Sequence, residues 1–129
     1  KYILTFLGVS PCVDLYINGI FVGYGEASHN SYEFDVSEYL KKGENEVIVI
    51  VHKWCTGSYL EAQDMFRENG IFRDVLLYEY DSAYINDFQA VPKKNGKKYD
   101  LVIDTEVIGS FKNSSIKVSL CDGKDVIAL

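Results

Sequence analysis

Carboxylate, amide and aromatic side chains gather in residues 58–67, which read Ser-Tyr-Leu-Glu-Ala-Gln-Asp-Met-Phe-Arg. Aromatic rings cover the C–H faces of a sugar, and carboxylates and amides hydrogen-bond its hydroxyl groups, so this mixture is typical of a site for a polyhydroxylated ligand. Asp64 is the first candidate, because an ionised carboxylate accepts a hydroxyl proton and still coordinates a hard cation through oxygen. Met65 and Phe66 either line the same pocket or anchor the segment in the core.

The same segment also permits a purely structural interpretation. Ser58 as an N-cap, Glu61 three residues later and Gly70 at the end describe a short capped helix on which Asp64 is merely exposed. Glu61 and Asp64 share an i,i+3 spacing, and retaining glycosidases use two carboxyl groups about 5–5.5 Å apart. Such pairs are common by chance, and we assign neither residue a catalytic role.

Two apolar runs typical of β-strands, residues 47–54 and 71–80, must position this segment. The connection between them is longer than the ~12–15 residues usual in a compact domain, and such connections are commonly functional. Trp54 at its start is either a sugar platform or, the better interpretation, a core anchor. We expect Arg67, Arg73 and Asp74 to form ion pairs that pin the loop to the strand beneath it.

The remaining strand signals predict an all-β chain. Asn18-Gly19 tolerates the positive φ of a type I′ turn, so it joins residues 13–17 and 20–24 in a hairpin. Asp35 or Ser37 is placed to cap a single helical turn. Further strands are expected at residues 1–9, 34–36, 46–53, 85–91, 99–108, 115–121 and 125–129.

The order and spacing of these strands divide the chain into two parts. Residues 1–80 fit a partial jelly-roll sandwich, and residues 81–129 fit the first strands of an immunoglobulin-like sandwich. The lysine-rich residues 92–98 read as a solvated hairpin tip. Both ends of the chain interrupt strand-like patterns, so we expect it to be a piece of a longer parent protein.

An ordered set of motifs carries a family resemblance. Residues 59–67 (YLEAQDMFR) and 70–75 (GIFRDV) resemble the end of the sugar-binding domain of β-galactosidases in glycoside hydrolase family 2. Shorter motifs upstream fall in the matching order: residues 14–19 (DLYING), 22–24 (VGY), 33–35 (EFD) and 43–45 (GEN). Phe66 stands where the family commonly has Trp, and Ala62 where it commonly has Asp.

The resemblance implies a galactose-binding-like jelly roll and a parent that hydrolyses terminal β-D-galactosides with retention. It implies that Asp64 contacts galactose hydroxyls and ligates Na⁺ or K⁺, and that Mg²⁺ and a homo-oligomeric state belong to the parent. The family's two catalytic glutamates lie on a TIM barrel that this chain does not contain. We therefore expect the chain to form a non-catalytic wall of the galactose site and to be inactive alone.

Charge and cysteine content exclude other classes. The net charge of −6, with no basic stripe, argues against nucleic acid and against an anionic membrane surface. Cys12, Cys55 and Cys121 have no metal-binding spacing, which favours buried free thiols in a reducing compartment and a cytoplasmic parent. Two alternatives remain open: a stand-alone carbohydrate-binding module, and a scaffold in a β-glucuronidase- or mannosidase-like relative.

Overall fold

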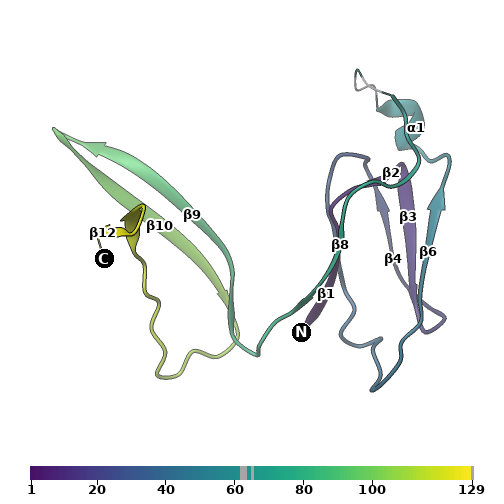
Figure 1. Ribbon diagram of the computed structural model, residues 1–129, viewed down its shortest axis with the longest axis horizontal. Coiled ribbons are helices and arrows are strands. Elements are labelled where there is room, and N and C mark those ends of the chain that lie inside the picture. The colour runs from purple at the N-terminus through teal and green to yellow at the C-terminus, as the bar shows by residue number, and fades with distance from the viewer. Residues whose placement is uncertain (62–63, 65, 129) are drawn as a thin grey trace. The chain divides into compact units, whose positions relative to one another are not determined.

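The structure, a computed structural model, describes residues 1–61, 64 and 66–128 of the chain (Figure 1). The chain forms two compact units, Lys1–Tyr80 and Asp81–Leu129. Its described secondary structure consists of β-strands and one four-residue helix, which confirms the all-β prediction. The first unit contains β1 (Tyr2–Phe6), β2 (Val9–Ser10), β3 (Cys12–Ile17), β4 (Ile20–Glu26), β5 (Tyr32–Asp35), β6 (Val47–His52), α1 (Gly57–Leu60), β7 (Gly70–Ile71) and β8 (Val75–Glu79).

Two antiparallel three-stranded sheets face each other in this first unit, in the orders β5-β1-β8 and β4-β3-β6. The predicted hairpin between β3 and β4 is confirmed: Asn18 has φ 52° and Gly19 has φ 79°. Both sheets contribute to one core, because Phe6 of β1 and Leu15 of β3 are completely buried in the same cluster. The first unit is therefore a β-sandwich.

Alternate glycines on β4 let the two sheets approach closely. A Cβ atom on Gly23 would lie 2.8 Å from the Phe34 ring, and one on Gly25 would lie 2.7 Å from the Tyr32 ring. The aromatic side chains of β5 therefore occupy the space that side chains would otherwise take on β4.

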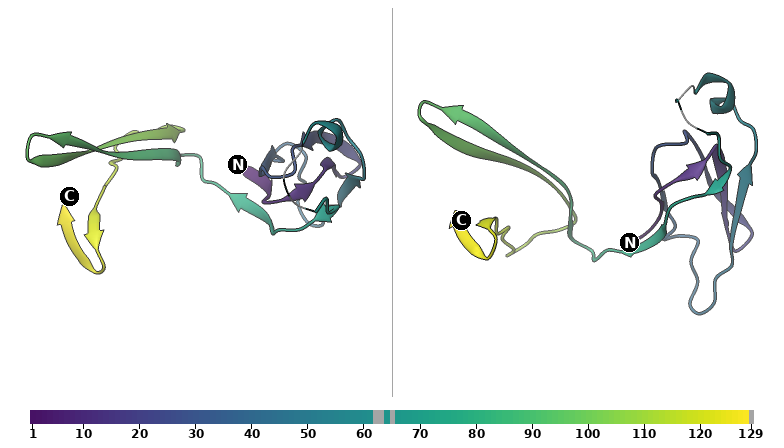
Figure 2. Two further views of the ribbon diagram at one scale, coloured as in Figure 1. Left: turned by 90° about the horizontal axis from the view of Figure 1, so that it is seen from above. Right: turned by 45° about the horizontal axis from the view of Figure 1, so that its top comes forward.

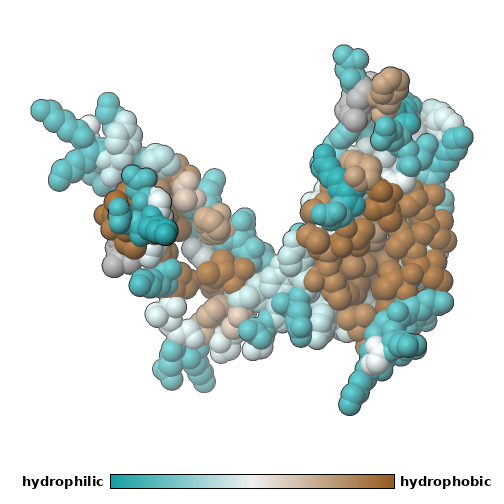
Figure 3. Space-filling model, viewed as in Figure 1, coloured by the Kyte–Doolittle hydropathy of each residue, from teal (hydrophilic) through white to brown (hydrophobic). Residues whose placement is uncertain are grey.

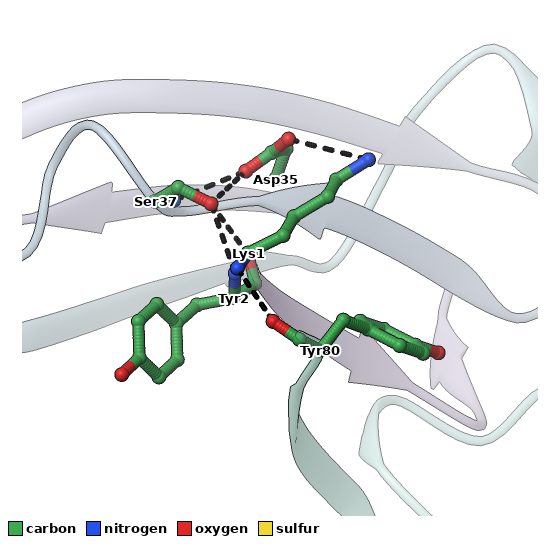
Figure 4. Close-up of polar contacts among 5 residues, drawn as sticks. All are labelled: Lys1, Tyr2, Asp35, Ser37 and Tyr80. Carbon is green, nitrogen blue, oxygen red and sulfur yellow. Dashed lines mark hydrogen bonds and ion pairs between the residues drawn. The ribbon is translucent and has the colours of Figure 1, made fainter. Parts of the chain in front are cut away.

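The start of β1, the central strand of the first sheet, is held by contacts with residues far away in the sequence (Figure 4). The Lys1 ammonium group at the N-terminus donates to the Tyr80 carbonyl at 2.9 Å, and the Lys1 side chain lies 3.5 Å from the Asp35 carboxylate. The Tyr2 amide donates to the Ser37 hydroxyl at 2.9 Å, and that hydroxyl donates to Asp35 at 2.6 Å. These bonds tie β1 to both of its neighbouring strands.

Several predicted element bounds change in the structure. The strand expected over residues 1–9 stops at Phe6, and β2 forms a separate pair with β7. The run 71–80 is likewise divided, into β7 and β8. Between these two strands, the Asp74 carbonyl accepts a bond from the Leu7 amide. Asp35 does accept a bond from the Ser37 amide at 3.1 Å, but the residues that follow form a turn and not a helix.

The second unit consists of two hairpins that form separate sheets: β9 (Tyr84–Asn95) with β10 (Lys98–Ile108), and β11 (Leu120–Asp122) with β12 (Asp125–Ala128) (Figure 2). The lysine-rich segment is a hairpin tip, but strand pairing extends to Asn95 and the turn itself is Gly96-Lys97. The strand expected over residues 115–121 forms only from Leu120. Every side chain described between residues 81 and 127 is at least partly exposed, so these hairpins enclose no core.

Candidate functional site

The segment between β6 and β7 begins with a short helix. The Cys55 amide donates to the Ser58 hydroxyl at 3.1 Å, and the Ser58 amide returns a bond to the Cys55 carbonyl at the same distance. Helix α1 ends at Leu60, because Glu61 adopts an extended conformation with ψ 128°. The alternative of a capped helix running from Ser58 to Gly70 is therefore wrong.

Glu26 at the end of β4 fixes the start of this helix. Its carboxylate accepts a short hydrogen bond from the Gly57 amide and a second, at 2.9 Å, from the Tyr24 hydroxyl. These two hydrogen bonds hold the pKa of the Glu26 carboxyl below its ordinary value, and the bond from the Gly57 amide has the larger effect. The sheet thereby satisfies one of the backbone donors left free at the helix N-terminus.

Glu61 and Arg67 hold the next part of the loop in place. The Glu61 carboxylate accepts a bond from the Ser28 hydroxyl at 2.7 Å and another from the Ser28 amide at 3.3 Å. Arg67 donates to the Ser58 carbonyl and, at 2.9 Å, to the Glu61 carbonyl. The pKa of the Tyr32 hydroxyl is raised to about 12. Burial is the main cause, and the negative charge of Glu61 is the second.

The expected ion pairs are wrong for the described residues. Both arginines of the segment bind backbone carbonyls, Arg73 donating to Leu7 at 3.4 Å while its guanidinium lies 5.4 Å from the centre of the Phe72 ring. The Asp74 carbonyl accepts a bond from the Leu7 amide, just after β1. Arginine-to-carbonyl bonds thus hold the loop, and no ion pair joins these arginines to a carboxylate among the described residues.

Asp64 and Phe66 extend from this held loop into solvent. Asp64 is exposed, and no hydrogen bond or ion pair joins it to another described residue. Phe66 is 90% exposed, so it does not anchor the loop in the core of the first unit. Met65, the third predicted ligand-contacting residue, and Ala62 lie outside the described residues.

A cavity of about 340 Å³ lies beside Phe66, and Asp64 is not among the described residues that line it. Its lining is aromatic on Trp54, Phe66 and Phe72, and it includes Glu61 and Arg67. Trp54 is 62% exposed, so it is not an anchor in the core of the first unit. Its ring centre lies 6.4 Å from that of Tyr59. Exposed rings next to fixed polar groups are the features by which proteins bind sugars, and the volume falls in the lower range of small-molecule sites.

Glu61 and Asp64, the two loop carboxylates whose spacing resembles that of an acid–base pair, have different contacts in the structure. Glu61 is engaged by Ser28, whereas Asp64 is available to a ligand or cation. The described residues contain no group of three or more His, Cys, Asp or Glu side chains suited to a metal ion. A cation at Asp64 would therefore take its other ligands from carbonyl, hydroxyl or water oxygens, which are the ligands of hard cations.

Sequence reasoning missed one polar pair on the outer face of the second sheet. The His52 imidazole lies 2.7 Å from the Asp14 carboxylate. The strand register explains this contact. His52 lies opposite Cys12, and Asp14, two residues further along β3, points to the same face of the sheet. None of the described helices is long and apolar enough to cross a membrane.

The fold is shared with solved glycosidases. The structure matches a β-glucuronidase from Bacteroides uniformis with a TM-score of 0.73 and 22% identity, covering 83% of this chain and 14% of that one. It matches a β-galacturonidase from Eisenbergiella tayi, solved with bound galacturonate, with a TM-score of 0.71 and 22% identity, covering 82% of this chain and 19% of that one. At these identities the likeness concerns the fold alone.

Sequence comparison gives stronger matches. The chain is 56% identical over 88 residues to a β-galactosidase of Actinobacillus pleuropneumoniae, covering 68% of this chain and 9% of the relative. It is 36% identical over 129 residues to a β-galactosidase of Streptococcus thermophilus, covering 98% of this chain and 13% of the relative. The chain thus spans about a tenth of the length of these relatives.

The family resemblance that the motifs predict is confirmed by a family model. The model of the sugar binding domain of glycosyl hydrolases family 2 matches residues 1–81, which include both sheets of the first unit and the whole 54–70 loop. The chain therefore belongs to the glycosyl hydrolases of family 2.

Proposed function

We propose that this chain is part of a β-galactosidase that hydrolyses terminal β-D-galactosides with retention of configuration. The observation that carries the proposal is the 56% identity to a β-galactosidase over a stretch of 88 residues. In this proposal the first unit is part of the sugar-binding jelly roll, and residues 81–129 begin an immunoglobulin-like sandwich. Cleavage takes place on two glutamates of a TIM barrel elsewhere in the parent protein, through a covalent glycosyl-enzyme.

The role of this chain is to orient the sugar. Asp64 accepts hydrogen bonds from galactose hydroxyls, and Met65 and Phe66 border the same ring. The exposure of Asp64 and Phe66, on a loop held at Glu61 and Arg67, supports this role because free side chains on a fixed backbone position a substrate without rearrangement. Such positioning acts on the rate although the residues take no part in bond making.

We also propose that Asp64 ligates a monovalent cation, Na⁺ or K⁺, next to the sugar. An exposed carboxylate without a protein partner among the described residues fits a hard cation. The Mg²⁺ that we expect for the parent is assigned to no residue of this chain. The parent, in this proposal, is a cytoplasmic homo-oligomer.

Replacing the proposed contact residue tests this function. In the complete parent protein, we expect Asp64→Ala to lower kcat/KM for lactose by about 100-fold or more, because a positioning contact made in the transition state is lost. Glu44→Ala, which removes an exposed carboxylate in the turn between β5 and β6, is the control and should change kcat/KM less than twofold. Near-normal turnover by Asp64→Ala would overturn the role of Asp64 in the site.

Direct titration separates this function from that of a self-contained binding module. A clear calorimetric isotherm of the isolated chain with galactose would favour the module, because it would require the whole pocket to lie within these residues.

A further inference from the structure

The dipeptide Asn-Gly occurs three times in the chain, at residues 18–19, 69–70 and 95–96. An Asn side chain that precedes Gly is prone to lose its amide group, because glycine has no Cβ atom to keep the side-chain carbonyl carbon away from the next backbone nitrogen. A Cβ atom built on any of these glycines meets no atom beyond its chain neighbours within 4 Å. The space at the glycine therefore does not distinguish the three pairs, and the Asn side chains must do so.

The half-buried Asn18 is hydrogen-bonded through both ends of its amide group. Its Nδ2 donates to the Tyr39 carbonyl and to Oδ1 of Asn45, each at 2.9 Å. Its Oδ1 accepts a bond from the Glu46 amide at 3.1 Å. All three bonds have to break before the Asn18 side chain can turn onto the backbone of Gly19.

Asn95 and Asn69 are both exposed, but their contacts differ. Asn95 donates one hydrogen bond, to the Asp100 carboxylate at 2.8 Å. No hydrogen bond joins the Asn69 side chain to another described residue. The strand that follows it, β7, begins at Gly70 and pairs over only two residues. Asn69 is therefore the least restrained of the three side chains.

We propose that Asn69 is a modification site at which the chain deamidates spontaneously. The Gly70 backbone nitrogen loses its proton and attacks Cγ of Asn69. A new C–N bond forms, the bond from Cγ to Nδ2 breaks, and Nδ2 takes up a proton and leaves as ammonia. Water then adds to either carbonyl carbon of the cyclic imide and opens it to aspartate or isoaspartate. The reaction consumes one water molecule and requires no oxidant or cofactor.

Deamidation would change the charge of the cavity beside the loop. Asn69 shares the described lining of this cavity with charged side chains of both signs: Glu61, Glu68, Lys53 and Arg67. These two carboxylates and two cations balance when His29 is counted as neutral, so a carboxylate at residue 69 makes the described lining net negative. The isoaspartate product also lengthens the backbone by one methylene group where the loop enters β7. The proposal does not depend on which glycoside the parent cleaves.

Peptide mapping of the complete parent protein tests the proposal. The folded protein is incubated in a warm, mildly alkaline buffer, which favours loss of the backbone proton. Samples taken over time are digested at acidic pH, and mass spectrometry measures the acid and amide forms of each Asn-Gly peptide. We expect Asn69 to deamidate about fivefold faster than Asn95 and about 100-fold faster than Asn18, because one and three hydrogen bonds, respectively, must break first.

The same protein unfolded in guanidinium chloride is the matched control. Without the folded-state hydrogen bonds, the three asparagines should deamidate at rates within about threefold of one another. Asp100→Ala, which removes the partner of Asn95, should bring the rate at Asn95 up to that at Asn69. Asn69→Gln should abolish the conversion at residue 69, because its longer side chain would have to close a larger ring. A folded-state rate at Asn69 no higher than that at Asn18 would overturn the proposal.

Discussion

At the level of single residues, carboxylates that look equivalent in the sequence have different roles in the loop. Glu61 is bonded to Ser28 and helps to fix the backbone, whereas Asp64, three residues later, is exposed and has no described partner. Glu26 belongs to another strand and holds the Gly57 amide. The spacing of Glu61 and Asp64 suggests a pair, but only one of the two is available to bind a ligand.

The proposed cation role of Asp64 predicts a specific effect of removing its charge. Asp64→Asn keeps the shape of the side chain and one oxygen, but it removes the negative charge that attracts the ion. In the complete parent protein, we expect Na⁺ to activate lactose hydrolysis at concentrations about tenfold higher than in the wild type. A sodium titration of kcat/KM at constant ionic strength measures this, and an unchanged sodium midpoint would argue against the assignment.

At the level of elements, the sequence predicted those features that depend only on neighbouring residues. The turn at Asn18-Gly19 and the length of the unusual connection follow from residue types, and the structure bears them out. Trp54 and the arginines were misjudged because burial and ion pairing depend on which segments meet in space.

The bond between Glu26 and helix α1 predicts a pH dependence. Because the pKa of the Glu26 carboxyl is lowered in the folded state, the bond stabilises the fold above the ordinary pKa of 4.5, and this contribution is lost as the pH falls below it. We expect hydrogen exchange of residues 57–60, corrected for the intrinsic rate, to accelerate below about pH 4.5.

Glu26→Gln should show the faster exchange already at neutral pH and no further step below pH 4.5. Glu44→Gln, in an exposed turn, is the matched control and should behave as the wild type. A wild-type profile without any step in this pH range would contradict the role given to Glu26.

The close approach of β4 and β5 predicts a cost for adding one methyl group. Gly23→Ala would place its Cβ 2.8 Å from the Phe34 ring, so the ring must move, which costs about 1–3 kcal/mol in a packed core. We expect local opening of β4, measured by hydrogen exchange in the complete protein, to become at least about fivefold more frequent.

Gly57→Ala is the matched control for this substitution. The nearest atoms to its added Cβ are carboxylate oxygens of Glu61 and Glu26, at 3.1 and 3.3 Å, which need to shift by only a few tenths of an ångström. A larger effect at Gly57 than at Gly23 would refute the packing argument.

At the level of the whole molecule, the first unit presents apolar side chains that its own strands do not cover. By register, Leu77 of β8 lies opposite Leu4 and Val75 lies opposite Phe6, so these residues share the core-facing side of their sheet. Leu77 is nevertheless 58% exposed and Val75 41% exposed. Figure 3 shows a broad hydrophobic face over the strands of this unit, bordered by hydrophilic ends. Exposed patches of this kind mark interaction sites, which agrees with the proposal that this chain is part of a larger β-galactosidase.

The incomplete cover of the core and of the loop predicts how the isolated chain behaves with sugar. Titration with galactose or lactose in a calorimeter should give no heat of binding at millimolar ligand, because Phe66 is 90% exposed and a single wall buries too little of a sugar to offset the cost of immobilising it. The complete parent protein, titrated with galactose under the same conditions, is the positive control. A saturable isotherm from the isolated chain, lost in Asp64→Ala, would instead place a whole sugar site within these residues.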